Sequence, residues 1–139
     1  MKSTFGRIHG GLTLLISVGV LVQMFLAGIW HARVVSSPDA HIMFGLGLLL
    51  ASLLALLAAI FGGLGRRAIG LTALLFVLIL LQPILIEQRR AGLPILSAFH
   101  TLNAAFIGIV GGIVARVSQV ARAEREEAAL GGAIVSPGD

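Results

Sequence analysis

Two histidines stand out because each lies close to the start of a long apolar segment. His41 follows Pro38 by three residues, and His100 follows Pro94 by six. Proline is common in the first turn of a helix, so each histidine should lie just inside a helix. Placing an imidazole in an apolar environment costs free energy unless its nitrogens form hydrogen bonds or bind a metal, and these nitrogens are good metal ligands. The pair therefore predicts a metal site held by two imidazoles.

The composition of the chain is that of a membrane protein. It has 139 residues, of which 58% are hydrophobic and 12% charged, and it has no cysteine. A soluble domain of this length has a very different balance. Without cysteine there is neither a disulfide nor a thiolate metal site, so metal chemistry must fall to His, Met or carboxylates. The net charge of +4 comes mostly from residues outside the apolar segments, which favours lipid headgroups, and we expect no nucleic-acid partner.

Four apolar segments are long enough to cross a bilayer, which takes roughly 20 helical residues. They cover about residues 8–30, 38–63, 67–88 and 94–116. The sequence thus predicts an all-α fold, a transmembrane up-down four-helix bundle over residues 1–117. Residues 118–139 are predicted to form a cytoplasmic extension of the fourth helix and, past Gly132, a loose tail. We expect neither an internal repeat nor a second domain.

The positive charges predict how the chain is oriented in the membrane. With a cytoplasmic N-terminus, the outer side would hold only Arg33, Arg89 and Arg90. The remaining cations would lie inside: Lys2, Arg7, Arg66, Arg67, Arg116, Arg122 and Arg125. Cytoplasmic loops carry an excess of Lys and Arg. We therefore expect a multi-pass protein of the bacterial inner (cytoplasmic) membrane, with both termini in the cytoplasm.

The two histidines should lie at similar depth in the outer leaflet. A helical rise of 1.5 Å per residue separates them by only about 4 to 5 Å along the membrane normal. Their helices form the diagonal of an up-down bundle, roughly 11 to 14 Å apart, which suits an imidazole, a metal and an imidazole in line. Small residues follow at helical spacing and would line this space: Gly45, Ala104 and Gly108. The same stripes are typical of close helix packing in membranes.

Three amides lie in the same half of the membrane as the histidines. They are Gln23 in the first span, Gln82 near the end of the third, and Asn103 in the fourth. Each could fix the tautomer of a ligating imidazole. Each could equally join two helices by a hydrogen bond. They are therefore candidates for the cofactor site with a structural alternative.

Three arginines flank the predicted site on the outer side. Arg33, Arg89 and Arg90 stand where the carboxylates of a porphyrin would emerge. The planar guanidinium suits carboxylates. Their alternative role is to anchor helix ends to lipid headgroups.

The other two histidines are weaker candidates. His31 follows Trp30, a pairing typical of an interfacial anchor. A copper or zinc site of His31 with Asp39 and His41 is a less favoured alternative, because the spacing matches no rigid motif. His9 has no second histidine in its leaflet, so no second two-histidine site is expected.

Several segments resemble known membrane proteins. The stretch "HIMFGLGLLLASLLALLAAI" from His41, then "LLFVLILLQPIL" and "FHTLNAAFIGIVGGIVARV", resembles one four-helix half of the haem A synthase family. The segments "QMFLAG" and "HTLNA" are similar to small four-span bacterial membrane proteins of unassigned function. The first resemblance implies that His41 and His100 are the axial ligands of haem b. The synthase half that performs chemistry has Glu three residues before its first ligating His, where this chain has Pro38, so haem modification is not implied.

The sequence thus predicts an integral membrane b-type haem protein with an electron-transfer role, alone or as a subunit. Two axial imidazoles leave iron no open position, which favours electron transfer over oxygen chemistry. The alternative is a non-catalytic accessory subunit of a respiratory or photosynthetic complex, with one histidine-ligated chlorophyll-type pigment or no cofactor. Partners would be lipid, other membrane subunits or further copies of the chain. No catalytic residue is expected, because hydrolase and phosphate-binding motifs are missing and no span carries a central charge.

Overall fold

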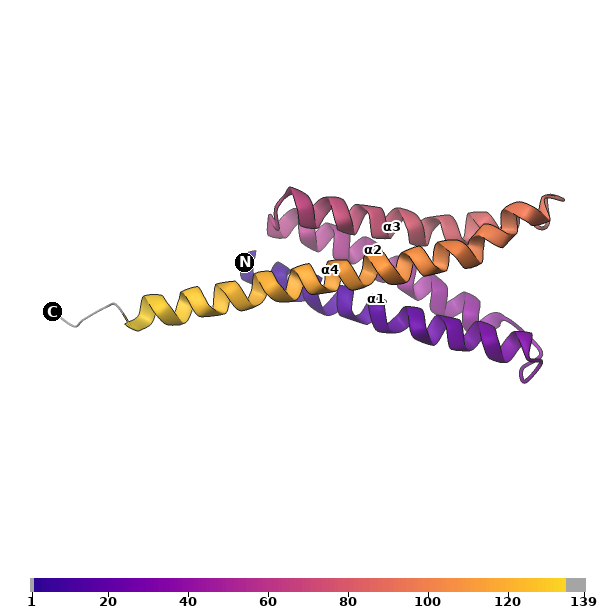
Figure 1. Ribbon diagram of the computed structural model, residues 1–139, viewed down its shortest axis with the longest axis horizontal. Coiled ribbons are helices and arrows are strands. Elements are labelled where there is room, and N and C mark those ends of the chain that lie inside the picture. The colour runs from indigo at the N-terminus through magenta and orange to yellow at the C-terminus, as the bar shows by residue number, and fades with distance from the viewer. Residues whose placement is uncertain (1, 135–139) are drawn as a thin grey trace.

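The computed structural model describes residues 2–134 and consists of four helices over this range (Figure 1). They are α1 (Lys2–His31), α2 (Asp39–Gly62), α3 (Arg66–Glu87) and α4 (Pro94–Ile134). The described part contains no strand. This confirms the predicted all-helical fold class.

All four helices are long and apolar enough to cross a membrane. The candidate spans are Thr4–His31, Asp39–Gly62, Arg66–Glu87 and Pro94–Ala121. Large apolar side chains such as Leu21, Phe25 and Met43 are exposed along their flanks. Such a surface is costly in water and is satisfied by hydrocarbon. The chain therefore has the features of a multi-pass membrane protein.

Each helix packs against two others. α1 and α3 each contact both α2 and α4, so α1 lies opposite α3, and α2 lies opposite α4. Each helix contributes at least one almost fully buried apolar residue, among them Ile16, Ala55, Leu75 and Val114. The helices that carry His41 and His100, α2 and α4, are therefore a diagonal pair.

Two helix ends differ slightly from their predicted positions. α2 begins at Asp39 and not at Pro38, and the Asp39 backbone N–H donates to Ser37 Oγ at 3.1 Å. α4 continues without interruption beyond the fourth apolar segment as far as Ile134. The first two residues of the predicted loose tail are thus helical, and the rest of that tail lies outside the described residues.

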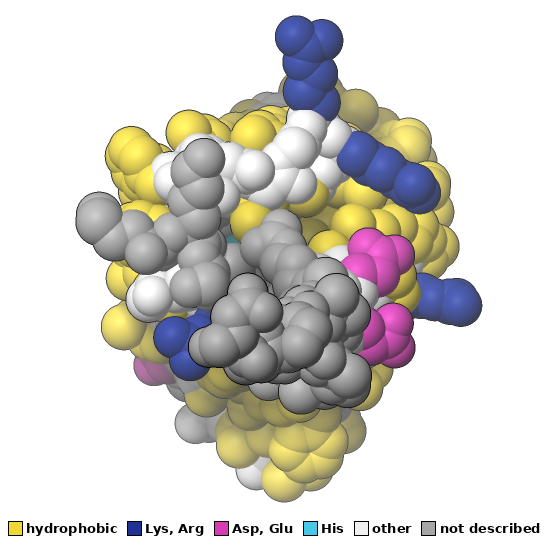
Figure 2. Space-filling view, turned by 90° about the vertical axis from the view of Figure 1, so that its left-hand side faces the viewer, with side chains coloured by type: hydrophobic (Ala, Val, Ile, Leu, Met, Phe, Trp, Pro, Cys, Tyr) yellow, Lys and Arg dark blue, Asp and Glu magenta, His cyan; other side chains and the backbone are white. Residues whose placement is uncertain are grey.

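Charged side chains gather at one end of the molecule. Figure 2 looks at the end that carries both termini, where basic and acidic side chains stand out beside apolar flanks. The exposed arginines of α1, α3 and α4 at this end are Arg7, Arg66, Arg67 and Arg116. We call it the terminal end. The opposite end, with the loops 32–38 and 88–93 and both His41 and His100, is the histidine end.

The prediction that the chain has no internal repeat is wrong. Residues 11–26 ("GLTLLISVGVLVQMFL") and 70–85 ("GLTALLFVLILLQPIL") are identical at half of their positions. The step from Gln23 to Gln82 is 59 residues, and the step from His41 to His100 is the same. The hairpin α1–α2 therefore corresponds to the hairpin α3–α4 at a constant step of 59 residues, although α4 begins at Pro94, four positions earlier in this register than α2 begins at Asp39.

The turns after α1 and α3 are built alike, which supports the repeat. Arg33 and Gly92, again 59 residues apart, both have positive φ, at 59° and 79°. Such a left-handed residue commonly ends a helix and favours glycine. Three backbone hydrogen bonds of the first turn have an equivalent 59 residues later in the second. In the first turn the N–H groups of Ala32, Arg33 and Val34 donate to the carbonyls of Gly28, Trp30 and Ile29, respectively. In the second turn Ala91, Gly92 and Leu93 donate in the same way to Glu87, Arg89 and Gln88.

The packed core lies towards the terminal end. None of the residues 21–47 or 80–102 is buried, and the two hairpins diverge towards the histidine end (Figure 1). Closer to the terminal end, residues at equivalent positions of the two repeats are both buried. Examples are Ile16 with Leu75 and Val20 with Ile79. The histidine end thus holds no buried residue, although single atoms there, Gln23 Oε1 and Gln82 Oε1, are buried.

Candidate functional site

The structure brings His41 and His100 together across the diagonal of the helices. The centres of the two imidazole rings are 6.2 Å apart, and the ring planes cross at 64°. Both side chains are half-buried. They come from equivalent positions of the two hairpins, so the pair lies where the repeats face each other.

One nitrogen of each ring is held by a backbone carbonyl of the preceding helix. His41 Nδ1 lies 3.2 Å from Gln23 O, and His100 Nδ1 lies 3.2 Å from Gln82 O. A carbonyl oxygen only accepts, so each Nδ1 carries the hydrogen and donates it. In the neutral ring, Nε2 then has a free lone pair, and neither Nε2 has a partner among the described residues. This is the tautomer and the anchoring that metal-ligating histidines commonly have.

The ring spacing matches two imidazoles on one metal ion. A metal–imidazole bond is about 2.0–2.1 Å, and the ring centre lies about 1.1 Å behind the nitrogen, so two rings in line have centres about 6.2–6.4 Å apart. The observed 6.2 Å agrees with that spacing. The spacing of the two rings thus allows one metal ion between them.

Gln23 holds His41 in a second way, with its side chain. Gln23 Nε2 donates to His41 O at 2.8 Å. Gly45, one turn further along α2, leaves the space for this amide, because a Cβ there would come within 2.6 Å of Gln23 Nε2. Gly45 thus contacts the residue that positions His41, a role that its small size alone did not indicate.

Gln82 occupies the equivalent position in the second hairpin but acts differently. Its backbone carbonyl accepts from His100, while its amide oxygen is buried without a partner among the described residues. The amide oxygen of Gln23 is also buried and unpaired. An unpaired buried acceptor costs roughly 1–3 kcal/mol. Both glutamines thus hold an unused acceptor near the histidine pair.

The remaining small and amide positions join helices. Asn103 is almost buried, and its Nδ2 donates to Leu78 O at 2.7 Å, which links α4 to α3. A Cβ at Gly108 would lie 3.9 Å from Val20 Cγ1, in ordinary contact with α1. Ala104 is half-buried one turn below His100. For Asn103 and Gly108 the structure favours the packing alternative.

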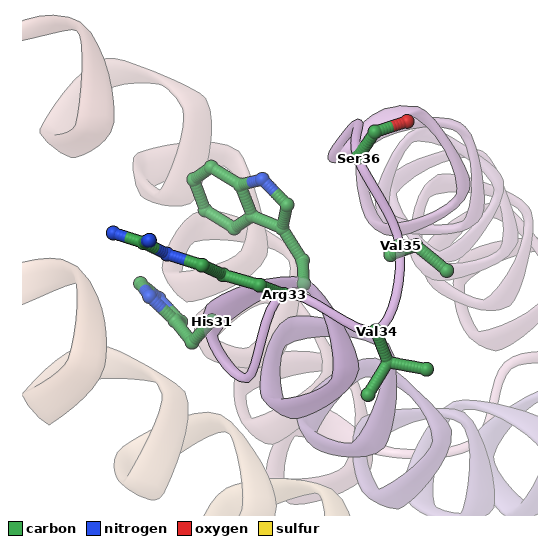
Figure 3. Close-up of a pocket in the computed structure, with 6 residues that line it drawn as sticks. His31, Arg33, Val34, Val35 and Ser36 are labelled. Carbon is green, nitrogen blue, oxygen red and sulfur yellow. The ribbon is translucent and has the colours of Figure 1, made fainter.

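One of the three candidate arginines lines a hollow at the histidine end. An open hollow of about 810 Å³ is lined by Trp30, His31, Arg33, Val34, Val35 and Ser36 (Figure 3). The side chains of His31 and Arg33 extend to the same side of the loop. The Trp30 and His31 rings lie 4.8 Å apart. This loop therefore combines a fixed cation with aromatic surface.

The other two arginines lie on the surface after α3. Arg90 forms an exposed ion pair with Glu87 at 3.2 Å, and Arg89 is exposed. An exposed pair of this kind contributes little to stability. All three arginines are exposed, and Arg33 is the one of them that lines the hollow.

His9, which the sequence left without a role, is the centre of a buried polar cluster. It is 1% exposed, with Nε2 2.9 Å from Thr72 Oγ1 and Nδ1 3.1 Å from Ser118 Oγ. The cluster joins α1, α3 and α4 near the terminal end. Both ring nitrogens are occupied, so His9 has no free lone pair for a metal. One feature of the sequence could have drawn attention to this cluster: Thr72, a partner of His9, lies in the repeated segment "GLT".

A protein-only metal site is not formed. No three His, Cys, Asp or Glu side chains come together among the residues that the structure describes. The alternative site of His31, Asp39 and His41 is therefore not assembled. Two imidazoles alone make a weak site for a free ion, whereas a porphyrin supplies four further nitrogens to its metal. The histidine pair consequently suits a metal that arrives inside a macrocycle.

Comparisons with models of protein families, with characterised proteins and with solved structures gave no match. The geometry of the histidine pair is therefore what supports a function for this chain.

Proposed function

We propose that the protein is an integral membrane b-type haem protein in which His41 and His100 ligate one haem iron from opposite sides. The observation that carries this proposal is the 6.2 Å spacing of two imidazoles whose Nδ1 atoms are both anchored. A bound haem supplies one-electron redox chemistry at its iron. The chain's own residues bind, orient and insulate it.

The two backbone carbonyls orient the ligands. Gln23 O and Gln82 O accept from Nδ1 of His41 and His100, which fixes the ring planes and keeps Nε2 free of hydrogen. Such a bond also raises the basicity of the ligating nitrogen. The carbonyls therefore prepare both imidazoles for metal binding before a haem arrives.

The apolar surroundings favour electron transfer. Within the described α2 and α4, Asp39 at the start of α2 is the one charged residue near the histidine pair, and the rest of both spans around the pair is mostly apolar. A site with two imidazole ligands in a low-dielectric environment suits outer-sphere electron transfer. We therefore assign an electron-transfer role, either in a single chain or as a subunit.

Arg33 would hold a carboxylate of the macrocycle. It lines the hollow at the histidine end beside His31 (Figure 3). The planar fork of a guanidinium matches a carboxylate, and a low-dielectric boundary strengthens the pair. Arg89 and Arg90, on the loop of the other hairpin, are further candidates for the second carboxylate.

We further propose an up-down bundle with both termini in the cytoplasm of a bacterium and the chain in its inner membrane. The arginines at the terminal end, four of which are exposed, support this orientation. The histidine end then faces the outer side. The electron partner would accordingly reach the haem from that side.

The proposal is tested by the visible spectrum of the purified full chain after reconstitution with haemin. We expect sharp bands in the reduced protein and one haem per chain. His41→Ala and His100→Ala should each abolish the low-spin spectrum, while His31→Ala, a matched control, should preserve it. A wild-type protein that stays colourless overturns the proposal. A colourless protein that co-purifies in fixed ratio with a larger membrane complex would favour the accessory-subunit alternative.

A further inference from the structure

The internal repeat makes the two histidine positions directly comparable, and they are held unequally. His41 has two bonds to Gln23: its ring donates to the Gln23 carbonyl at 3.2 Å, and its own carbonyl accepts from the Gln23 amide at 2.8 Å. Gly45 leaves room for that amide. The ring and the backbone of His41 are thus both tied to one residue of α1.

His100 has only the first of these two bonds. Its ring donates to Gln82 O, but the Gln82 amide donates to no α4 carbonyl among the described residues. Position 104 carries alanine where the first hairpin has Gly45. The nearest side-chain link between α3 and α4 is Asn103 to Leu78 O, one turn away. The backbone at His100 is therefore tied less directly to its neighbour than the backbone at His41.

The helix that carries the His100 acceptor is also weaker at this point. Pro83 lies inside α3, immediately after Gln82, where the first hairpin has Met24. A proline within a helix removes one backbone hydrogen bond and displaces the carbonyl one turn before it. The starts of α2 and α4 both lack buried residues, so the difference between the two hairpins lies in α3. The α3 segment that places His100 can thus shift at smaller cost than the unbroken helix around Gln23.

Resting on the proposed haem function, we infer that His41 is the permanent axial ligand and that His100 is an exchangeable one. With a reduced haem bound, a small neutral ligand such as carbon monoxide would then compete with His100 and not with His41. In such an exchange one bond from the external ligand would replace the bond from His100 Nε2. No electron or proton is transferred.

The unequal anchoring is the physical reason for the exchange. A ligand competes with an external molecule through the free energy needed to displace its side chain and backbone. Displacing the His41 ring breaks its bond to Gln23 O, and displacing the α2 backbone with it also breaks the bond from the Gln23 amide. At His100 only the ring bond, to Gln82 O, is present, so the helix backbone can move with the ring at smaller cost. An external ligand would therefore replace His100 in preference to His41.

The experiment uses the full chain in detergent, loaded with haemin, reduced with dithionite and then exposed to carbon monoxide. We expect the low-spin spectrum of the reduced wild type to convert to that of a carbon monoxide complex. His100→Ala should retain haem and bind carbon monoxide faster than the wild type. His41→Ala should lower the haem affinity by more than about tenfold.

A second pair of variants keeps both imidazoles, so that a loss of haem binding cannot be attributed to a missing ligand or to a cavity left by a histidine. Gln23→Leu removes the amide bond to His41, and Gln82→Leu is its matched counterpart in the other hairpin. We expect Gln23→Leu to weaken haem binding by about tenfold and Gln82→Leu by less than about twofold. Equal effects of the two changes overturn the inference.

The possible failures are distinguishable. A haem-loaded wild type whose reduced spectrum does not change with carbon monoxide overturns the inference and leaves the haem function standing. A wild type that binds no haem overturns the haem function and, with it, the inference. Equal haem affinity in His41→Ala and His100→Ala also overturns the inference alone.

Discussion

Gln23 and His41 are joined by two reciprocal hydrogen bonds between neighbouring helices: the Gln23 amide donates to His41 O at 2.8 Å, and His41 Nδ1 donates to Gln23 O at 3.2 Å. The first bond fixes where the backbone of α2 lies, and the second fixes the plane of the ring. A ligating side chain that is set by both bonds loses little freedom when it binds a metal. The proposed cofactor site would depend on this arrangement.

Gly45→Ala should disturb it directly. The added Cβ would come within 2.6 Å of Gln23 Nε2, so the amide must move and its bond to His41 O must weaken. We expect haem affinity to fall about tenfold. Gly47→Ala is the matched control, because no atom lies within 4 Å of a Cβ at that position. Haem titration of both variants decides the point, and equal affinities would contradict the role given to Gly45.

Asn103→Ala should affect the fold more than the cofactor. The change removes the bond to Leu78 O, which links α3 and α4. Interhelical hydrogen bonds in membranes contribute about 0.6–2 kcal/mol each. We expect the free energy of unfolding in mixed micelles to fall by that amount while haem content stays near one per chain. A colourless but equally stable variant would instead make Asn103 part of the cofactor site.

His9→Ala should destabilise the terminal end without changing the haem spectrum. It removes both bonds of a fully buried ring, to Thr72 and Ser118, and leaves a cavity. The expected loss is about 2–4 kcal/mol. His31→Ala, at an exposed histidine, should cost far less. Unfolding midpoints of the two variants measure the difference, and similar midpoints would argue against the three-helix role of His9.

Arg33→Gly should stabilise the chain while weakening its hold on an anionic group. Arg33 has φ of 59°, a conformation that costs a residue with a side chain about 1–2 kcal/mol. The equivalent residue in the second hairpin, Gly92, avoids that cost. We expect the cofactor-free protein to gain about that much stability, and Gly92→Ala to lose it. If Arg33→Gly lowers stability without haem, the side chain has a structural role that its exposed position does not indicate.

The fold was predictable because the bilayer sets the length of each element. A hydrocarbon layer about 30 Å thick demands apolar helices of roughly 20 residues, and four such segments are plain in the chain. Pro38 and Pro94 indicated where α2 and α4 begin, to within one residue. From those starts, the helical rise gave the depths of His41 and His100.

The details of the site could not be predicted because they depend on how each helix is rotated about its axis. The apolar segments have weak patterns, so nothing in the sequence indicated that Gln23 would face His41 or that Asn103 would face Leu78. The partners of His9 lie 63 and 109 residues away. Such contacts follow from tertiary packing, which no local pattern records.

The repeat is hard to recognise in the sequence for a different reason. Identical leucines in two apolar segments carry little information, because any two membrane helices share them. The informative matches are Thr13 with Thr72, Gln23 with Gln82 and His41 with His100, which fall at one constant step. The matching turns at Arg33 and Gly92 made that step evident in the structure.

The most direct measurement is the electron paramagnetic resonance spectrum of the oxidised, haem-loaded chain. The 64° angle between the rings of His41 and His100 predicts the strongly anisotropic low-spin signal of crossed axial imidazoles. That signal should disappear in both His41→Ala and His100→Ala and persist in His31→Ala. A wild type without a haem signal, or a low-spin signal that survives loss of either histidine, would contradict ligation by this pair.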